Sequence, residues 1–249
     1  MKKLTNNIIY IIGILLIPIV WIVIKYSLNI EDRFLPSPKS LLTAFNTIEP
    51  NVFIHASFSY LRLIIGFIAG IIIGIGVGLL FFKSTFIYNL LYPTFQSLRS
   101  IPPYATIPFF LLWFGFSETG KFIIILFGIS FNLTIASFQA LSTIREKYHI
   151  FFKSINKKAK NFIMSFTLPY VLDNILPTLR FSLSTAIGLV VVAEMLGSQV
   201  GLGYLIQTAK STFSLNVVFL AAILFGLINY ITDQILIILW KRIVFWKSY

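Results

Sequence analysis

The chain has 249 residues, of which 57% are hydrophobic and 11% are charged, and its net charge is +12. Soluble domains carry about 25% charged residues, so this composition excludes an ordinary soluble domain. It predicts an all-α polytopic membrane bundle, because helices satisfy their backbone hydrogen bonds inside a bilayer. The absence of cysteine excludes disulfides, thiolate metal sites and cysteine nucleophiles. Basic residues cluster at the ends of apolar runs, which indicates a topology signal rather than nucleic-acid binding.

Six apolar runs approach the length of about 20 residues that a helix needs to cross a bilayer. We expect a single transmembrane domain over residues 1–249, with spans at about 8–28, 57–82, 85–114, 122–141, 172–197 and 214–240. Lys2 and Lys3 precede the first run and no small-residue cleavage site follows it, so a retained span is expected rather than a signal peptide. The positive-inside rule then places both termini in the cytoplasm of a cell-membrane protein.

Between the first two runs, residues 35–38 read LPSP. Two prolines so close together do not fit a helix interior. This segment therefore predicts an extended entry into a short surface helix from about Lys39.

The second run carries glycines at every fourth position, at Gly66, Gly70, Gly74 and Gly78. This spacing places them on one helical face, and Gly76 broadens it. Small faces let membrane helices approach closely, because packing drives their association in lipid. We expect the face to meet another helix, either in the same subunit or in a partner.

The third run is interrupted by Arg99, Ser100, Ile101, Pro102 and Pro103, and Pro108 follows. These prolines remove hydrogen bonds from the helical ladder, and the freed carbonyls need protein or water as a partner. Discontinuous helices are typical of transport paths. A translocation path at this break, with Arg99 facing it, is the functional interpretation, and a plain proline kink is the alternative.

Residues 115–121 read GFSETGK and match the GxxxxGK pattern of a phosphate-binding loop. That loop needs a Ser or Thr next, for the metal ion, and a preceding strand. Phe122 follows here and an apolar run precedes, so no ATP site is predicted in this segment.

Charged residues inside the runs are few, and their depths suggest two ion pairs. Arg62 and Glu194 are both expected towards the outer side of the membrane, and Arg180 and Asp233 both at a similar depth from the inner side. Charges in lipid pair with each other or line water. Glu194 is also a candidate for the translocation path.

A basic interval over residues 142–172 separates the fourth and fifth spans. Thr143 and Glu146 fit a capping box that opens a helix, Asn156 suits a turn, and a second short helix is expected over about 158–167. Such a segment is either a docking surface for a cytoplasmic partner or a solvated charge run that sets topology.

The order of motifs resembles the permease subunit of a binding-protein-dependent ABC importer, in the sulfonate, taurine, nitrate and thiamine-precursor branch. The matching segments are 35–38 (LPSP), 98–103 (LRSIPP), 113–115 (WFG) with Glu118 and Lys121, 168–169 (LP), 193–197 (AEMLG) and 201–206 (GLGYLI). The resemblance covers essentially the whole chain.

The resemblance implies a path formed by two permease subunits, as a homodimer in the lipid bilayer. It also implies an external solute-binding protein and cytoplasmic ATPases that hold ATP and magnesium, with no cofactor and no catalysis on this chain. The basic interval would be the coupling-helix loop that contacts the ATPase. The residues expected to make this contact are Phe151, Phe152, Lys153, Ser154, Ile155, Asn156 and Lys157.

The coupling loop departs from the family pattern of Glu-Ala-Ala followed by Gly ahead of the Leu-Pro. Counted back from Pro169, Ile150, Phe151 and Phe152 occupy the Glu-Ala-Ala positions and Asn156 occupies the Gly position. Asn can keep the turn that Gly would make. The missing Glu points to a diverged ATPase partner or to a decayed subunit.

Two other functions compete with the importer. An ion-coupled secondary transporter would use the intramembrane carboxylates Glu194 and Asp233, although no internal repeat of spans is visible. A membrane enzyme lacks support, because no nucleophile lies beside a base and no carboxylates are closely paired in the sequence. The substrate stays open between small anions and a neutral pyrimidine.

Overall fold

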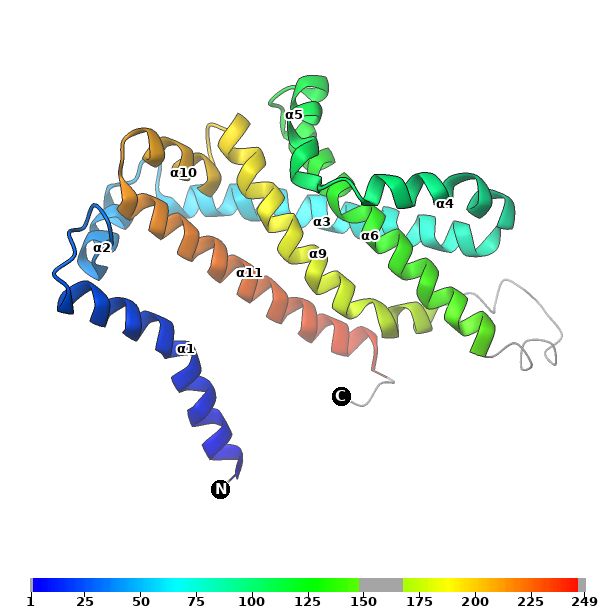
Figure 1. Ribbon diagram of the computed structural model, residues 1–249, viewed down its shortest axis with the longest axis horizontal. Coiled ribbons are helices and arrows are strands. Elements are labelled where there is room, and N and C mark those ends of the chain that lie inside the picture. The colour runs from blue at the N-terminus through cyan, green and yellow to red at the C-terminus, as the bar shows by residue number, and fades with distance from the viewer. Residues whose placement is uncertain (1, 148–167, 246–249) are drawn as a thin grey trace.

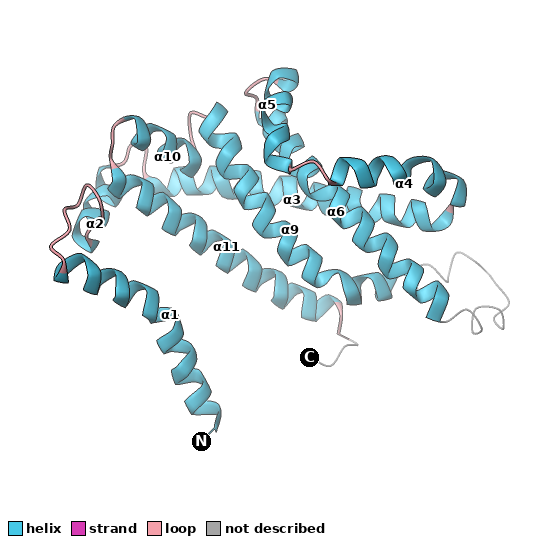
Figure 2. Cartoon of the chain, viewed as in Figure 1, coloured by secondary structure: helices cyan, strands magenta, loops and turns pink. Residues whose placement is uncertain are grey.

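The computed structural model describes residues 2–147 and 168–245, and within them all regular structure is helical (Figures 1 and 2). The helices are α1 (Lys2–Ser27), α2 (Pro38–Thr47), α3 (Val52–Lys83), α4 (Thr85–Arg99), α5 (Pro103–Phe114), α6 (Glu118–Lys147), α9 (Leu168–Gly197), α10 (Leu202–Ser211) and α11 (Leu215–Ile243). The all-α prediction is therefore confirmed for the described residues.

Four helices are long and apolar enough to cross a bilayer, over Val52–Lys83, Glu118–Thr143, Pro169–Gly197 and Leu215–Ile243. Two shorter apolar helical stretches, Leu15–Ser27 and Pro103–Phe114, fall in the first and third predicted spans. Helix α1 extends away from the other helices in Figure 1. The count of six spans stays a prediction.

The most extensive contact between two described helices is that of α3 with α6, and the four glycines make it possible. Added Cβ atoms would lie 2.7 Å from Ile125 at Gly66, 2.5 Å from Ile129 at Gly70, 2.6 Å from Leu133 at Gly74 and 2.7 Å from Ser137 at Gly78. The glycine face therefore meets a helix of the same chain. Nothing lies within 4 Å of Gly76, so this residue is not part of the contact.

This contact also fixes the direction of the chain. The contacting positions rise together by four on both helices, from Gly66 with Ile125 to Gly78 with Ser137. Rising together means that α3 and α6 run parallel. The segment between them, α4 followed by α5, must therefore return the chain to the end at which α3 began. The broken third run thus forms the return segment, in two pieces.

Helix α4 is held against α3 and α6 by aromatic side chains. The Phe81 ring lies edge-on to Phe95 with 5.2 Å between centroids, and Tyr88 stacks on Phe138 at 4.6 Å. Such geometries add to the area that the rings bury. Pro93 and Pro108 lie inside α4 and α5, so the expectation that Pro108 interrupts the helix was wrong.

The expected capping box at Thr143 and Glu146 was also wrong, because α6 continues through it to Lys147. Thr143 Oγ1 donates to the Gln139 carbonyl at 3.0 Å. A Thr inside a helix often bonds to the carbonyl four residues earlier in this way, instead of capping the N-terminus of a new helix. At the other end of the interval, α9 begins at Leu168, four residues before the predicted fifth span.

The connection between α1 and α2 is ordered by side-chain hydrogen bonds. Ser37 caps α2, accepting from the Ser40 N–H at 3.2 Å, and Pro38 occupies the first turn. Lys25 Nζ lies 2.6 Å from the Asp32 carboxylate. The hydrogen bond from Lys25 lowers the pKa of Asp32 below its usual value. Helix α2 begins one residue before the predicted start.

Candidate functional site

The predicted interruption lies between α4 and α5. Helix α4 ends at Arg99 and α5 begins at Pro103. Ser100 Oγ donates to the Gln96 carbonyl at 3.1 Å, and the Ala105 N–H donates to the Pro102 carbonyl at 2.9 Å. Pro102 and Pro103 lack N–H groups, so the ladder stops here, while Pro103 suits the first turn of α5.

Two glycines on neighbouring helices allow the start of α5 to pack closely against them. A Cβ at Gly128 on α6 would lie 3.2 Å from Pro103 Cβ and would overlap Leu189 of α9. A Cβ at Gly188 on α9 would overlap the hydroxyl of Tyr104. The break is thus packed into α6 and α9 by close backbone approach and is not a loose connection.

Two hollows border the break, and Arg99 lines both. The larger, of about 600 Å³, is lined by Gln96, Ser97, Arg99 and Ser100. The smaller, of about 40 Å³, is lined by Leu98, Arg99, Ile101, Pro103, Phe127, Gly128, Phe131 and Asn132. Polar groups dominate the first hollow, whereas apolar side chains and the polar side chains of Arg99 and Asn132 share the lining of the second.

A second polar region surrounds Arg62 near the N-terminal end of α3. Its Nη1 lies 2.7 Å from Glu194 on α9, and its Nε and Nη2 bind Glu118 on α6 at 2.6 and 2.7 Å. Lys121 adds a contact of 2.9 Å to Glu118. The Arg62 and Glu194 side chains are buried, whereas that of Glu118 is half exposed. Arg62 thus joins α3, α6 and α9.

The Glu194 carboxylate also anchors the turn between α9 and α10. It accepts from Ser59 Oγ at 2.8 Å and from the Gly203 N–H at 2.9 Å. Ser59 Oγ in turn accepts from the Leu202 N–H at 2.9 Å, and His55 Nδ1 accepts from the Gly201 N–H at 3.1 Å. Side chains of α3 and α9 therefore satisfy the first amides of α10, which would otherwise lack partners at a helix start.

Gly201 in this turn has φ of +141°, and a Cβ there would overlap the Glu194 carboxylate. Both facts require glycine at this position. We call His55, Ser59, Arg62, Glu118, Lys121, Glu194 and Gly201 the α3 clamp.

The structure contains both ion pairs that were expected from depth. Arg62 pairs with Glu194 in the α3 clamp. Arg180 pairs with Asp233 of α11 through contacts of 2.7 and 2.8 Å, with its side chain half exposed. In contrast, no carboxylate of the described residues lies within ion-pair distance of Arg99.

Glu194 does not line either hollow at the break. Its carboxylate is buried and bound by Arg62, Ser59 and Gly203. Its oxygens bind the turn after α9, and its candidacy for the translocation path stays a prediction. Sequence reasoning missed His55, Ser59 and Glu118 as its companions. Positions 55, 59 and 62 continue the glycine spacing of α3 towards its N-terminus, and this was the available signal.

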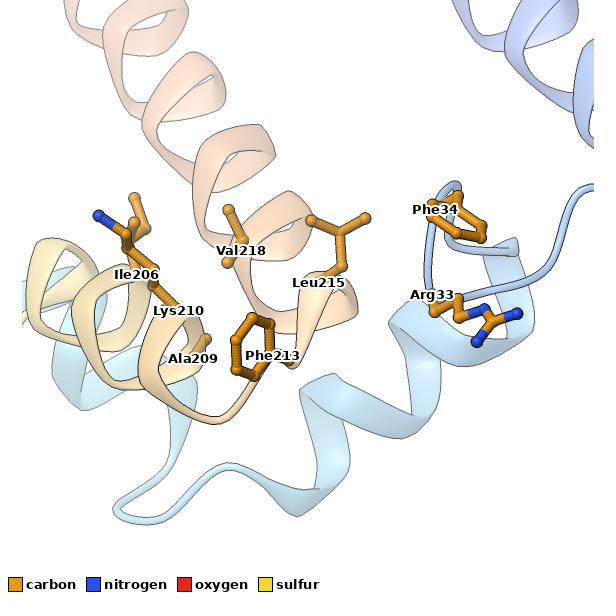
Figure 3. Close-up of a pocket in the computed structure, with 8 residues that line it drawn as sticks. All are labelled: Arg33, Phe34, Ile206, Ala209, Lys210, Phe213, Leu215 and Val218. Carbon is orange, nitrogen blue, oxygen red and sulfur yellow. The ribbon is translucent and has the colours of Figure 1, made fainter.

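A third hollow, of about 470 Å³, lies between the α1–α2 connection, α10 and α11 (Figure 3). Phe34, Phe213, Leu215 and Val218 contribute apolar walls. The charged ends of Arg33 and Lys210 point away from it in Figure 3. This hollow therefore lacks the groups that would bind a polar solute.

The described residues contain no group of three or more His, Asp or Glu side chains that could hold a metal ion. The predicted coupling residues, Phe151 to Lys157, lie outside the described residues.

Comparisons with known proteins identify relatives along most of the chain. Residues 66–244 match the family model described as the binding-protein-dependent transport system inner membrane component. The putative aliphatic sulfonates transport permease protein SsuC of Bacillus subtilis (strain 168) is 33% identical over 92% of this chain and 84% of its own length. The taurine transport system permease protein TauC of Escherichia coli (strain K12) is 25% identical over 92% of this chain and 86% of its own.

Among solved structures, an inward-facing form of the MetNI methionine ABC transporter superposes with a TM-score of 0.60. It covers 76% of this chain and 98% of that chain at 19% identity. This likeness shows a shared fold.

Proposed function

The chain belongs to the family of binding-protein-dependent transport inner membrane components, and from this premise we propose that it forms half of the solute path of an ATP-driven importer. The solute is a small polar molecule, either an anion such as a sulfonate, taurine or nitrate, or a thiamine-precursor pyrimidine. A second copy supplies the other half as a homodimer. A solute-binding protein delivers the solute from outside the cell membrane.

The observation that carries the proposal is the break between α4 and α5. It lies inside the family match, and Gly128 of α6 and Gly188 of α9 allow its close packing on these helices. It is bordered by Arg99, which has no carboxylate partner among residues 2–147 and 168–245. Non-helical backbone at membrane depth is tolerated where it lines protein or water. Arg99, Ser100, Pro102 and Pro103 are the residues we assign to the path.

We assign the energy source to ATP on partner subunits, and the match to binding-protein-dependent transport components supports this assignment. An ion-coupled transporter would need a carboxylate that exchanges ions. Glu194 and Asp233 are both engaged by arginines, which argues against that alternative. With both termini in the cytoplasm, residues 148–167 connect α6 to α9 on the cytoplasmic side. There they would meet the ATPase.

The decisive experiment is purification of the chain from its native membrane, followed by uptake in proteoliposomes. A co-purifying ATPase and uptake that requires internal ATP would support the importer. Uptake that follows an imposed ion gradient without ATP would overturn it.

Coupling has its own test in the segment from Phe151 to Lys157. We expect Asn156→Pro and Lys157→Glu to abolish ATP-driven uptake while membrane insertion stays normal. Normal uptake in both variants would remove these residues from the ATPase contact.

A further inference from the structure

The hollow between the α1–α2 connection, α10 and α11 shares no lining residue with the two hollows at the break (Figure 3). Leu215 and Val218 form one of its walls and lie in the first turn of α11, a helix long and apolar enough to cross a bilayer. The end of such a helix lies where the hydrocarbon core meets the lipid headgroups. Phe34 at the rim is 67% exposed. The open side of the hollow therefore lies at the level of the headgroups.

Phe213, at the edge of this hollow, has a backbone conformation that does not suit its side chain. Its N–H donates to the Lys210 carbonyl at 3.3 Å and the Ser214 N–H donates to the Ala209 carbonyl at 2.8 Å, which is the Schellman pattern that ends a helix. Phe213 has φ of +55°, and glycine is usual at this position because a Cβ is unfavourable there. The residue is 92% exposed, so contacts within the chain do not offset this cost. Its ring is therefore presented to something outside the chain.

Lys210 supplies a positive charge beside this ring. The two carboxylates of the α1–α2 connection are already paired, Asp32 with Lys25 at 2.6 Å and Glu31 with Arg33 at 2.5 Å. No carboxylate in the described part of the chain lies within ion-pair distance of Lys210. The charged end of Lys210 lies outside the apolar hollow in Figure 3. An amine outside apolar walls, at the end of a spanning helix, matches an anionic headgroup whose acyl chain lies between those walls.

We propose that this hollow binds one anionic phospholipid, of the phosphatidylglycerol type. Phe34, Leu215 and Val218 contact its acyl chain, the ring of Phe213 lies beside its glycerol, and Lys210 binds its phosphate. With both termini in the cytoplasm, the start of α11 lies in the outer leaflet. A zwitterionic lipid would bring its own cation close to Lys210 and bind less tightly. The site goes beyond the proposed function, because it involves neither the solute nor the ATPase.

The first test measures lipid preference on the full chain in detergent. Native mass spectrometry gives the dissociation constants of the first phosphatidylglycerol and the first phosphatidylcholine to bind, with identical acyl chains. Lys210→Gln should lower the preference for phosphatidylglycerol about fivefold, the factor that one basic residue contributes near an anionic lipid surface. Lys210→Arg should keep it. The matched control is Lys39→Gln, which removes an exposed cation of α2 that does not line the hollow. An unchanged preference in Lys210→Gln, or an equal loss in Lys39→Gln, would overturn the inference.

The second test separates a lipid contact of Phe213 from a role in the turn alone. Phe213→Gly relieves the unfavourable backbone conformation, so it should not lower the melting temperature in detergent without lipid. Added phosphatidylglycerol stabilises a protein that binds it in the folded state. We expect Phe213→Gly to lose most of the rise in melting temperature that wild type shows with this lipid. A rise equal to that of wild type would show that the ring has no lipid contact and would overturn the site.

The third test distinguishes lipid from a protein at the same place. The chain has no cysteine, so Phe213→Cys introduces a single thiol, which is studied in the assembled importer in phosphatidylglycerol nanodiscs. The thiol should react faster with an apolar maleimide than with a sulfonated one. A disulfide-linked dimer formed under mild oxidation would assign the hollow to a second copy of the chain. Protection from both reagents on addition of the solute-binding protein would assign it to that protein. Either result would overturn the lipid site.

Discussion

One face of α3 is built in two ways along its length. Its N-terminal part presents His55, Ser59 and Arg62, which bind partners through directed hydrogen bonds and ion pairs. Its C-terminal part presents four glycines from Gly66 to Gly78, which make contact through shape alone. The polar part is therefore sensitive to loss of a partner, whereas the glycine part is sensitive to added volume.

The largest effect is expected in the polar part, for Arg62→Met. This change leaves the buried Glu194 carboxylate without its counter-charge, and breaking a buried pair in this way costs about 3–5 kcal/mol. The measurement is the free energy of unfolding from SDS titration in mixed micelles. Arg62→Met/Glu194→Gln should recover part of the loss, because the uncompensated charge is gone. A single variant within 0.5 kcal/mol of wild type, taken as about the uncertainty of such comparisons, would contradict the clamp.

In the glycine part, Gly74→Val tests added volume. Its Cβ would lie 2.6 Å from Leu133 Cβ and 3.0 Å from the Ser130 carbonyl, so backbone has to move. Overpacking of this kind costs about 1–3 kcal/mol, measured by the same titration. Gly76→Val is the matched control, since nothing lies within 4 Å of that glycine. Equal losses in the two variants would show that β-branching, and not contact with α6, is responsible.

A finer test of the polar part removes one hydroxyl. Ser59→Ala should lower stability by about 1 kcal/mol, because the buried Leu202 N–H and Glu194 each lose a partner. Ser57→Ala serves as the control, since Ser57 is exposed and bonds only to the Phe53 carbonyl of its own helix. Hydrogen exchange at the Leu202 amide should accelerate in the first variant alone. Unchanged protection there would mean that Ser59 does not hold the turn.

The smallest effect concerns an ion pair outside the clamp, between Lys25 and Asp32. Its hydrogen bond lowers the pKa of Asp32 from 3.8. Stability from a depressed carboxyl pKa is present above the unfolded value and disappears as the pH falls through the folded value. The difference in melting temperature between wild type and Asp32→Asn should thus shrink below about pH 4. A difference that stays constant from pH 7 to pH 3, or an equal one in Glu31→Gln, would contradict this.

Several features of the fold could be predicted because they depend on local composition. The glycine spacing indicated a packing face on the second run, and the prolines after Arg99 located the break. The depths of Arg62 and Glu194 were enough to suggest their pairing. In each case the prediction needs only the spacing of residues within one helix, or the number of residues between a charge and the end of its run.

Other features depend on contacts that no single helix reveals. Hydropathy did not show that α6 continues past Thr143, because the basic residues there look like a loop. Nor did it show that Glu118 reaches Arg62, since Glu118 lies at the start of its run and looks exposed. The partners of Glu194 were not all predictable, because they include the Gly203 amide and a backbone group leaves no mark in the sequence.

The α3 clamp has a consequence for motion. The Leu202 amide at the start of α10 is bound by Ser59 of α3, and Arg62 joins α9 and α6 to α3. If α9 and α10 slid along α3 by one helical turn, the bonds that Ser59 and Arg62 make to them would break together. These four helix ends must therefore move as one rigid body. Any alternation between open and closed forms has to take its hinge elsewhere, and the short connection between Arg99 and Pro103 is where the described helices are interrupted.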